Sequence, residues 1–411
     1  MPMSRTSGAA GIAVLALGLM ACGGADSGPD VRTPEEIGPE AADGIAAEGT
    51  EAGGAEDRGA DGDLEDATPV PCAPYEGFGP WPVGVRTLDL PDRKVEVWYP
   101  AVPGSEAGRD RAAYDVREWL PPEEAAKIPD GAPSWFVMPA WRDLPAAPGP
   151  FPLALYSHGI AAFRSQSSWL TAHLASWGFV VAAPDHVERN LTAFMDGTFA
   201  FDDVGTRDLR ATRDLLLAES ARSGGPLEGR VDGTRVVATG HSMGAGAALV
   251  LVEQDGLAGA ACWAGGPSPQ LGVTPSRPLL MAAGTVDTLV PSAGQRTTWN
   301  GLAPTPRTFV SLDRAGHLAF TDLCAIGRDL GGLVAMAVSY GVAVPEFLEA
   351  LGSDGCQEGT LAPWDGWPVV GHYTVAHMRL VLGLDPEPRG LDDPTAACFG
   401  SRLEGWAFVA R

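Results

Sequence analysis

The amino-acid sequence predicts an α/β fold: a mostly parallel, doubly wound sheet with an antiparallel N-terminal edge and helices on both faces. Short apolar segments alternate with longer helical segments between residues 83 and 382. In the stretch 236–249, a strand-like run leads into a tight turn, and a helix-forming run follows at once. Polar, reactive side chains follow several of the expected strands, and ligands of such sheets bind at the carboxyl ends of the strands.

The expected strands are short apolar runs, at 83–90, 94–99, 153–157, 180–183, 235–239, 259–263, 279–283 and 308–312. The first two flank a Pro-Asp turn and form the antiparallel edge. Helices are expected at 168–177, at 208–220, directly after the turn near residue 242, and at 370–382, where the last helix should pack back onto the sheet. The Pro-rich segment 103–150 is predicted to be a surface insertion.

Residues 240–244 have the sequence Gly-His-Ser-Met-Gly between an expected strand and an expected helix. This order is typical of a nucleophile elbow, in which a serine lies on a strained turn with its hydroxyl exposed. Gly240 and Gly244 fit this geometry, because the backbone crowds closely on either side of the serine and leaves no room for a Cβ. The sequence therefore predicts Ser242 as a catalytic nucleophile, against the alternative of a chance match in a Gly-rich chain.

A serine hydroxyl is a weak nucleophile until a base takes its proton, and an acid must orient that base. Asp287 follows the expected strand 279–283, and His317 lies in the loop after the expected strand 308–312. Their order after Ser242 is the order Ser, acid, His that this arrangement requires. Asp287 has the alternative role of a helix N-cap or turn residue. Three other acids remain as candidates for the orienting role: Asp185, Asp313 and Asp322.

The oxyanion of the reaction needs two backbone N–H donors. Met243, directly after the serine, is predicted to supply one, and Ile160, in the loop after the strand 153–157, the other. Phe194, Phe199 and Trp263 are candidates for the wall of a substrate pocket, with plain core packing as an equal alternative.

The seven histidines do not show the spacing of a zinc site, in which two histidines flank a glutamate. His158 is expected to shape the oxyanion loop, and His241 occupies the variable position of the elbow. We therefore expect neither a metal nor another cofactor.

Residues 1–21 have the features of a secretory signal peptide. Arg5 precedes an apolar run that is too short to span a bilayer. Cys22 follows Leu-Met-Ala, which resembles the lipobox of bacterial lipoproteins and implies a lipid anchor on Cys22 of an exported protein. An ordinary signal peptide with an incidental cysteine is the alternative.

Residues 22–70 are predicted to form a disordered, acidic tether. Between residues 23 and 70, 14 acidic residues face two arginines and no aromatics, which accounts for half of the chain's net charge of −24. This acidic balance argues against nucleic acid as a partner. The remaining residues, 72–411, are predicted to form one domain with inserts near 103–150 and 323–365.

Export permits disulfides, and five cysteines remain after Cys22. Cys262 lies in an expected core strand and is interpreted as a buried thiol. The other four allow three pairings, of which the hypothesis is Cys324–Cys356, closing the second insert, with Cys72–Cys398 joining the two ends of the domain.

Four stretches carry a specific resemblance: 97–100, 151–164, 174–183 and 317–322. They resemble the platelet-activating-factor acetylhydrolases and their bacterial relatives, a group that merges with the dienelactone-hydrolase-like and polyester-hydrolase esterases of the α/β-hydrolase superfamily. The resemblance implies Ser242, Asp287 and His317 as nucleophile, acid and base, the amides of Ile160 and Met243 as the oxyanion hole, and hydrolysis of short-chain or oxidised acyl esters without a metal. Met243 departs from the aromatic residue usual in the animal enzymes, and the two inserts have no counterpart in the family.

The sequence thus predicts an exported, lipid-anchored monomer that cleaves carboxylic esters through an acyl-enzyme on Ser242. An acyltransferase with the same three residues is one alternative. The other alternative is a catalytically silent surface-binding lipoprotein with the same fold. The fold alone would not require Ser242, Asp287 and His317 in this order, which argues against that alternative.

Overall fold

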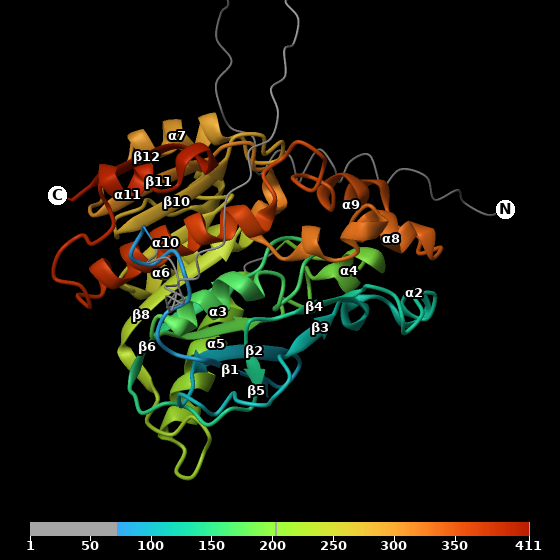
Figure 1. The fold of residues 1–411 in the computed structure, drawn as a ribbon, viewed down its shortest axis with the longest axis horizontal. Helices are drawn as coiled ribbons and strands as arrows, with labels where there is room; N and C mark the ends of the chain where they lie inside the picture. Colours follow the sequence, from blue (N-terminus) through green and yellow to red (C-terminus); the bar gives the residue numbers. More distant parts are fainter. Residues whose placement is uncertain (1–71, 202–203, 411) are drawn as a thin grey trace, which may run out of the picture. The chain divides into compact units, whose positions relative to one another are not determined.

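The computed structural model describes residues 72–201 and 204–410 (Figure 1). The predicted signal peptide 1–21, the predicted tether 22–70 and Cys22 lie outside the described residues. The strands are β1 (Val83–Asp89), β2 (Lys94–Pro100), β3 (Ala113–Asp115), β4 (Trp135–Val137), β5 (Trp141–Arg142), β6 (Phe151–Ser157), β7 (Val180–Pro184), β8 (Val231–His241), β9 (Ala260–Trp263), β10 (Leu279–Gly284), β11 (Arg307–Leu312) and β12 (Leu403–Val409).

Ten of these strands form one mixed sheet in the order β12-β11-β10-β9-β8-β6-β7-β2-β1-β5. The strands from β11 to β7 run parallel, and β2 pairs antiparallel with both β7 and β1. The central strands are short apolar runs buried on both faces, as parallel strands between two layers of helices must be. The predicted fold class, including the antiparallel N-terminal strands, is confirmed.

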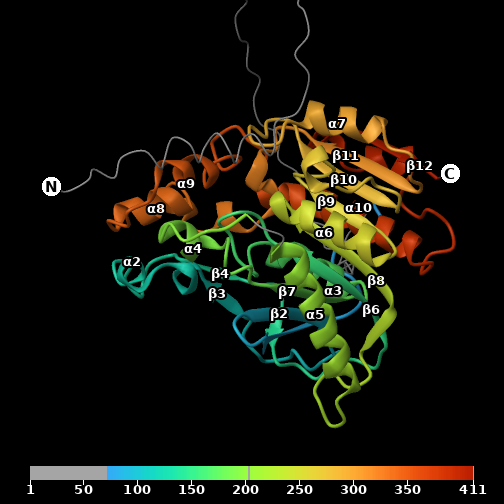
Figure 2. The same ribbon diagram turned by 180° about the vertical axis from the view of Figure 1, so that it is seen from behind.

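Helices cover both faces of the sheet (Figures 1 and 2). One face packs against α3 (Ser168–Ser176) and α10 (Pro363–Val381), and the other against α5 (Val204–Ala221), α6 (Met243–Asp255) and α7 (Ser292–Asn300). Four short helices are grouped at one end of the sheet in both views: α2 (Pro122–Ala125), α4 (Leu191–Met195), α8 (Leu333–Ser339) and α9 (Glu346–Leu351). Within the described part of the chain, no helix combines the length and apolar character needed to cross a membrane.

Two edge strands were not predicted. β12 adds an antiparallel strand beside β11, so the strand before His317 is not the last of the sheet. Its side chains are mostly half-buried, and Gly405 interrupts the run, which removes the apolar signal of a buried strand. β5 is only two residues long and joins β1 from within the segment 103–150. The last helix begins at Pro363, seven residues before the predicted start, and contains Pro368.

The described residues contain two disulfides, Cys72–Cys398 and Cys324–Cys356, and these are the two pairs of the sequence-based hypothesis. Cys262 is a free, buried thiol, and burial raises its pKa to about 12. Cys72–Cys398 joins the start of the described domain to the end of α11 (Asp393–Ala397), so the two ends of the domain are covalently tied.

We expect buried histidines to make the protein sensitive to acid, and His377 on α10 provides the test. Burial lowers the pKa of His377 to about 3, from an ordinary value of 6.5. The unfolded chain therefore binds a proton below about pH 6.5 that the folded chain does not, so this contribution to stability is lost as the pH falls from about 6.5 towards 3. His377→Gln should reduce the pH dependence of the free energy of unfolding by about 1.4 kcal/mol per pH unit near pH 5.

Urea denaturation at pH 7, 6 and 5 measures this slope. Thr308→Val removes the hydroxyl 3.0 Å from His377 Nδ1 and keeps the histidine, so it should change the stability and leave the slope almost unaltered. Equal slopes for the wild type and His377→Gln would contradict the expectation.

Candidate active site

Ser242 lies on the turn between β8 and α6, with φ of 56° and ψ of −124°. This left-handed φ is rare for a residue with a side chain and is held by close backbone contacts. A Cβ on Gly240 would lie 2.2 Å from the carbonyl oxygen of Gly244, and a Cβ on Gly244 would lie 2.1 Å from that of Ser157. Only glycine fits at both positions, so the strand and helix can approach closely enough to strain Ser242.

Asp287 and His317 are hydrogen-bonded to each other. Asp287 follows β10, His317 begins the short 3-10 helix η3 (His317–Phe320) after β11, and Asp287 Oδ2 lies 2.9 Å from His317 Nδ1. Both side chains are fully buried. The amides of Leu289 and Val290 donate to Asp287 Oδ1 at 2.9 and 2.7 Å, so a tight turn fixes the carboxylate. Because the carboxylate accepts from Nδ1–H, the lone pair of the imidazole is on Nε2.

Ser242 and His317 line the same pocket. Ser242 Oγ and His317 Nε2 are both buried, and neither has a hydrogen-bond partner within the described residues. Buried polar atoms are normally paired, and exceptions are frequent at sites that act on a ligand. The arrangement leaves one hydroxyl and one imidazole lone pair free in a common, largely apolar space.

The three other acids have different partners. Asp185 accepts from Arg164 Nη1 at 2.5 Å and from Trp119 Nε1 at 3.0 Å. Asp322 accepts from the amide and hydroxyl of Ser168 at the start of α3. Asp313 lies beside Arg314 at the surface. The carboxylate at the imidazole of His317 is therefore that of Asp287.

A second Ser-His-Asp series lies deeper in the protein. His186 is 2.8 Å from Ser157 Oγ through Nε2 and 2.9 Å from Asp208 through Nδ1. Arg189 donates to the same Ser157 hydroxyl at 3.0 Å, and neither Ser157 nor His186 lines the pocket. This group is a buried structural network, because its hydroxyl is already paired and the group does not line the pocket beside Ser242.

The network supports the loop that carries Ile160. The amide of His186 donates to His158 Nε2 at 2.9 Å, and His158 Nδ1 donates to the carbonyl of Gly159 at 2.8 Å. Burial, together with the nearby Arg189, lowers the pKa of His158 well below its usual range, so the ring is neutral. Gly159 packs against the elbow, since a Cβ there would lie 3.3 Å from the Cβ of Ser242. Ile160 follows directly and lines the pocket.

Met243 is the first residue of α6, and the first N–H groups of a helix have no acceptor within the helix. Met243 thus follows Ser242 at the start of α6, and Ile160 lines the same pocket from the loop after β6. Their role as an oxyanion hole stays a prediction.

His241 supports His317 from the side of the elbow. Its Nε2 donates to the carbonyl of His317 at 2.9 Å, and Gln166 Nε2 donates to its Nδ1 at 3.0 Å. Burial lowers the pKa of His241 well below its usual range, and His317 adds to this effect. Sequence reasoning had assigned His241 no role beyond its place in the elbow.

The three aromatic candidates lie outside the pocket lining. Phe194 stacks on Phe199 with ring centroids 4.3 Å apart, in an apolar cluster behind Ile160. Trp263 is fully buried in the core, where its Nε1 donates to Thr374 Oγ1 at 3.1 Å. Trp263 contacts the elbow through its backbone, because its carbonyl accepts from the amide of Ser242 at 2.9 Å.

Asp354 is a site residue that sequence reasoning missed. Its Oδ1 accepts from the amide of His317 at 2.7 Å, and its Oδ2 accepts from the amide of Thr288 at 3.0 Å and from the hydroxyl of the same residue. Its backbone carbonyl also accepts from the amide of Leu318 at 2.9 Å. One carboxylate thus links the loop of the acid to the loop of the histidine.

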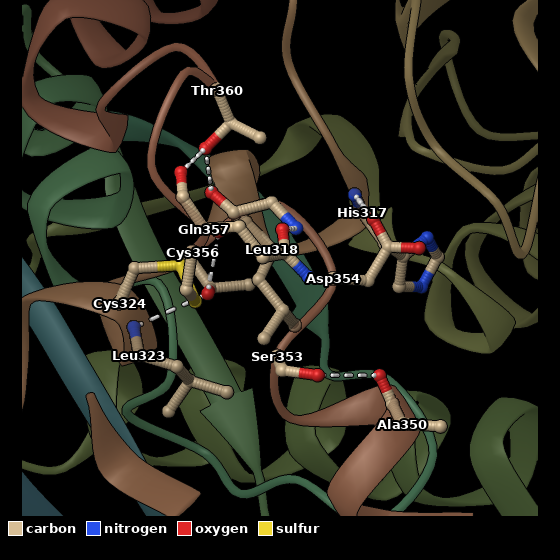
Figure 3. Close-up of a disulfide and its surroundings, with 12 residues drawn as sticks. His317, Leu318, Leu323, Cys324, Ala350, Ser353, Asp354, Cys356, Gln357 and Thr360 are labelled. Carbon is tan, nitrogen blue, oxygen red and sulfur yellow. Dashed lines mark hydrogen bonds between the residues drawn. A yellow bond between two sulfur atoms is a disulfide. The ribbon is translucent and has the colours of Figure 1, made fainter. Parts of the chain in front are cut away.

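Figure 3 shows Asp354 between His317 and the disulfide Cys324–Cys356. Gly316 permits this approach, because a Cβ there would lie 2.5 Å from Asp354 Oδ1. The predicted pairing of Cys324 with Cys356 was the available signal, since it brings residue 354 close to the segment after His317. Within residues 72–201 and 204–410, no group of three or more His, Cys, Asp or Glu side chains is placed to hold a metal ion.

The fold and the serine elbow define a protein of the α/β-hydrolase class. Residues 151–329 match the PET hydrolase-like family. Ser242, Asp287, His317 and Ile160 all lie within the matched segment, whereas Asp354 lies beyond it. The predicted membership of the α/β-hydrolase superfamily is confirmed.

Two relatives illustrate the similarity. A stretch of 185 residues is 30% identical to a bis(hydroxyethyl) terephthalate hydrolase of Streptomyces coelicolor and covers 42% of this chain and 52% of that protein. A stretch of 98 residues is 34% identical to cutinase est1 of Thermobifida alba and covers 24% of this chain and 29% of that protein. The chain thus spans about half or less of the length of these relatives.

We expect Asp354→Ala to lower kcat on an ester such as p-nitrophenyl butyrate by about 10- to 100-fold, with a smaller change in KM. The substitution leaves the amides of His317 and Thr288 without their acceptor and loosens both loops. Asp329→Ala is the control, because that exposed carboxylate lies in the same insert and contacts neither loop. A thermal melt verifies folding, and a folded Asp354→Ala protein with the kcat of the wild type would contradict the expectation.

Proposed function

We propose that this protein hydrolyses carboxylic esters through an acyl-enzyme on Ser242. Ser242 Oγ attacks the acyl carbon while His317 Nε2 takes the hydroxyl proton, and the amides of Ile160 and Met243 stabilise the oxyanion. His317 then gives this proton to the departing alcohol. Water attacks the acyl-enzyme by the same route and releases the acid, and Asp287 holds the imidazole in the required tautomer throughout.

One observation carries the proposal: the strained Ser242 shares a pocket with the unpaired Nε2 of an imidazole that is hydrogen-bonded to a buried carboxylate. Neither Ser242 Oγ nor His317 Nε2 has a hydrogen-bond partner within the described residues, so both atoms are free to act on a substrate. The names of the relatives, a cutinase and a terephthalate ester hydrolase, support the same reaction class. The resemblance to platelet-activating-factor acetylhydrolases favours short-chain or oxidised acyl esters as substrates.

An acyltransferase would use the same three residues and differ only in the acceptor. A short alcohol added to the reaction distinguishes the two, because a hydrolase gives mainly free acid and a transferase mainly the new ester. A silent binding protein on the same fold would release no product.

We further propose that the protein is exported and lipid-anchored through Cys22, acts as a monomer and binds no nucleic acid. Two disulfides support export, because such bonds persist in oxidising compartments. The anchor predicts that the full chain partitions into a detergent phase and that Cys22→Ser moves it to the aqueous phase. Equal partitioning of the two proteins would remove the anchor from the proposal.

For the reaction itself, we expect Ser242→Ala to reduce kcat/KM for p-nitrophenyl acetate and butyrate by at least about 10³-fold. The substitution removes one oxygen atom and keeps the fold, which circular dichroism can verify. Rates equal to those of the wild-type protein would exclude Ser242 as the nucleophile.

A further inference from the structure

The pocket beside Ser242 has uncharged, mainly aliphatic walls. None of its lining residues is Asp, Glu, Lys or Arg. Apart from Ser242 and His317, the polar side chains in the lining are those of Gln166 and His241, and these two are hydrogen-bonded to each other at 3.0 Å. Phe163 is the one aromatic ring besides the histidines, and its face already stacks on Trp119 with centroids 4.1 Å apart. The walls therefore offer a ligand apolar contacts and few polar ones.

A large part of the lining comes from two segments outside the part of the chain that matches the PET hydrolase-like family. We call residues 116–132 and 333–352 together the lid. The first segment contributes Val116, Leu120 and Ile128, and the second contributes residues from Leu333 to Gly352, on α8, on α9 and between them. In Figures 1 and 2, α2, α8 and α9 lie together at one end of the sheet.

The two parts of the lid are packed against each other. Ile128 and Ala132 form a buried cluster with Ala337 and Val342, and the amide of Ala343 donates to Glu124 Oε2 at 2.9 Å. Just beyond the second part, the disulfide Cys324–Cys356 ties the chain back to the segment after His317. The two segments of the lid therefore form one packed unit that is part of the pocket wall.

The lid covers the reactive groups. Ser242 is 5% exposed and His317 is fully buried. An ester in the middle of a polymer continues on both sides of the bond to be cleaved, and both continuations would have to pass the lid. An ester of a single short acid has a chain to accommodate on only one side of the bond to be cleaved. The acyl group stays on Ser242 after the alcohol has left, so a covered apolar pocket suits the acyl chain better than the departing alcohol.

From these observations, and building on the proposed function, we infer that the pocket is an acyl-binding site for an uncharged aliphatic chain of a discrete ester. The lid is its specificity determinant. Of the two acyl classes that the resemblance implies, the pocket selects the short aliphatic class over the oxidised class, because a terminal carboxylate would be buried without a partner. It also disfavours polymeric and aromatic polyesters.

The full chain is tested with p-nitrophenyl acetate, butyrate, hexanoate and octanoate, and with mono-p-nitrophenyl adipate. Hexanoate and adipate have the same number of carbon atoms and differ in the terminal carboxylate. We expect kcat/KM to rise by about threefold to fourfold for each methylene that enters the pocket, until the pocket is full. The adipate ester should be cleaved about 100-fold less efficiently than the hexanoate ester, and polyester film should release almost no product.

Two variants change the pocket in opposite directions. Ala337→Phe fills it and should lower the hexanoate-to-acetate ratio of kcat/KM by about tenfold, while Leu348→Ala enlarges it and should move the optimum to a longer chain. Leu216→Ala is the matched control, because Leu216 is a buried leucine of α5 that does not line the pocket. It should lower stability and leave the ratio unchanged.

The inference would be overturned if kcat/KM did not change with acyl chain length, or if the adipate and hexanoate esters were cleaved equally well. A flat acyl series together with a steep rise of kcat/KM with alcohol length among acetate esters would place the alcohol, and not the acyl chain, in the pocket. If Ser242→Ala abolishes hydrolysis in these cases, the proposed function stands and the acyl pocket does not. If hydrolysis does not depend on Ser242, the proposed function itself is wrong.

Discussion

The close contact between β8 and α6 is the constraint on which the rest of the site depends. A Cβ on Gly240 would lie 2.2 Å from the carbonyl oxygen of Gly244, and a Cβ on Gly244 would lie 2.1 Å from that of Ser157 at the end of β6. Ser242 lies between these two glycines and has a positive φ. The position of Ser242 determines where a base can reach it. It also determines which amides flank it, because α6 begins at the next residue and Gly159 packs on its Cβ. The strain is local, and the buried parallel strands on either side of β8 hold it in place.

His317 and Asp287, the proposed base and acid, are positioned by hydrogen bonds that cross between loops. Asp287 holds the imidazole of His317, and Asp354 holds the backbone of both loops at once. Asp354 belongs to the same insert as the second part of the lid, and the Cys324–Cys356 disulfide anchors that insert beside His317. One insert, most of which lies beyond the family match, thus supports His317 and lines the pocket. The proposed base and the lid therefore depend on the same short piece of chain.

The central sheet and the order of Ser242, Asp287 and His317 could be predicted because both depend on local signals: apolar runs of strand length, a glycine-flanked serine, and reactive residues directly after strands. The strand β12 could not be predicted, because a half-buried edge strand has neither a continuous apolar run nor a regular alternation of apolar and polar residues. The role of Asp354 could not be predicted either, since its contacts depend on long-range packing around Gly316 and on a disulfide. The lid was anticipated only as two inserts. Their apolar residues follow no sequence motif, so the cluster that the two inserts share is visible only in three dimensions.

The most direct test of the central claim is covalent labelling of the full chain with a p-nitrophenyl alkylphosphonate, which mimics the tetrahedral intermediate of ester cleavage. The account predicts release of about one p-nitrophenolate per chain and a single phosphonate adduct, located by peptide mass spectrometry on Ser242. In His317→Ala the labelling should be slower by about 100-fold or more. An adduct on a different residue, or equal labelling rates for the wild type and His317→Ala, would contradict the account.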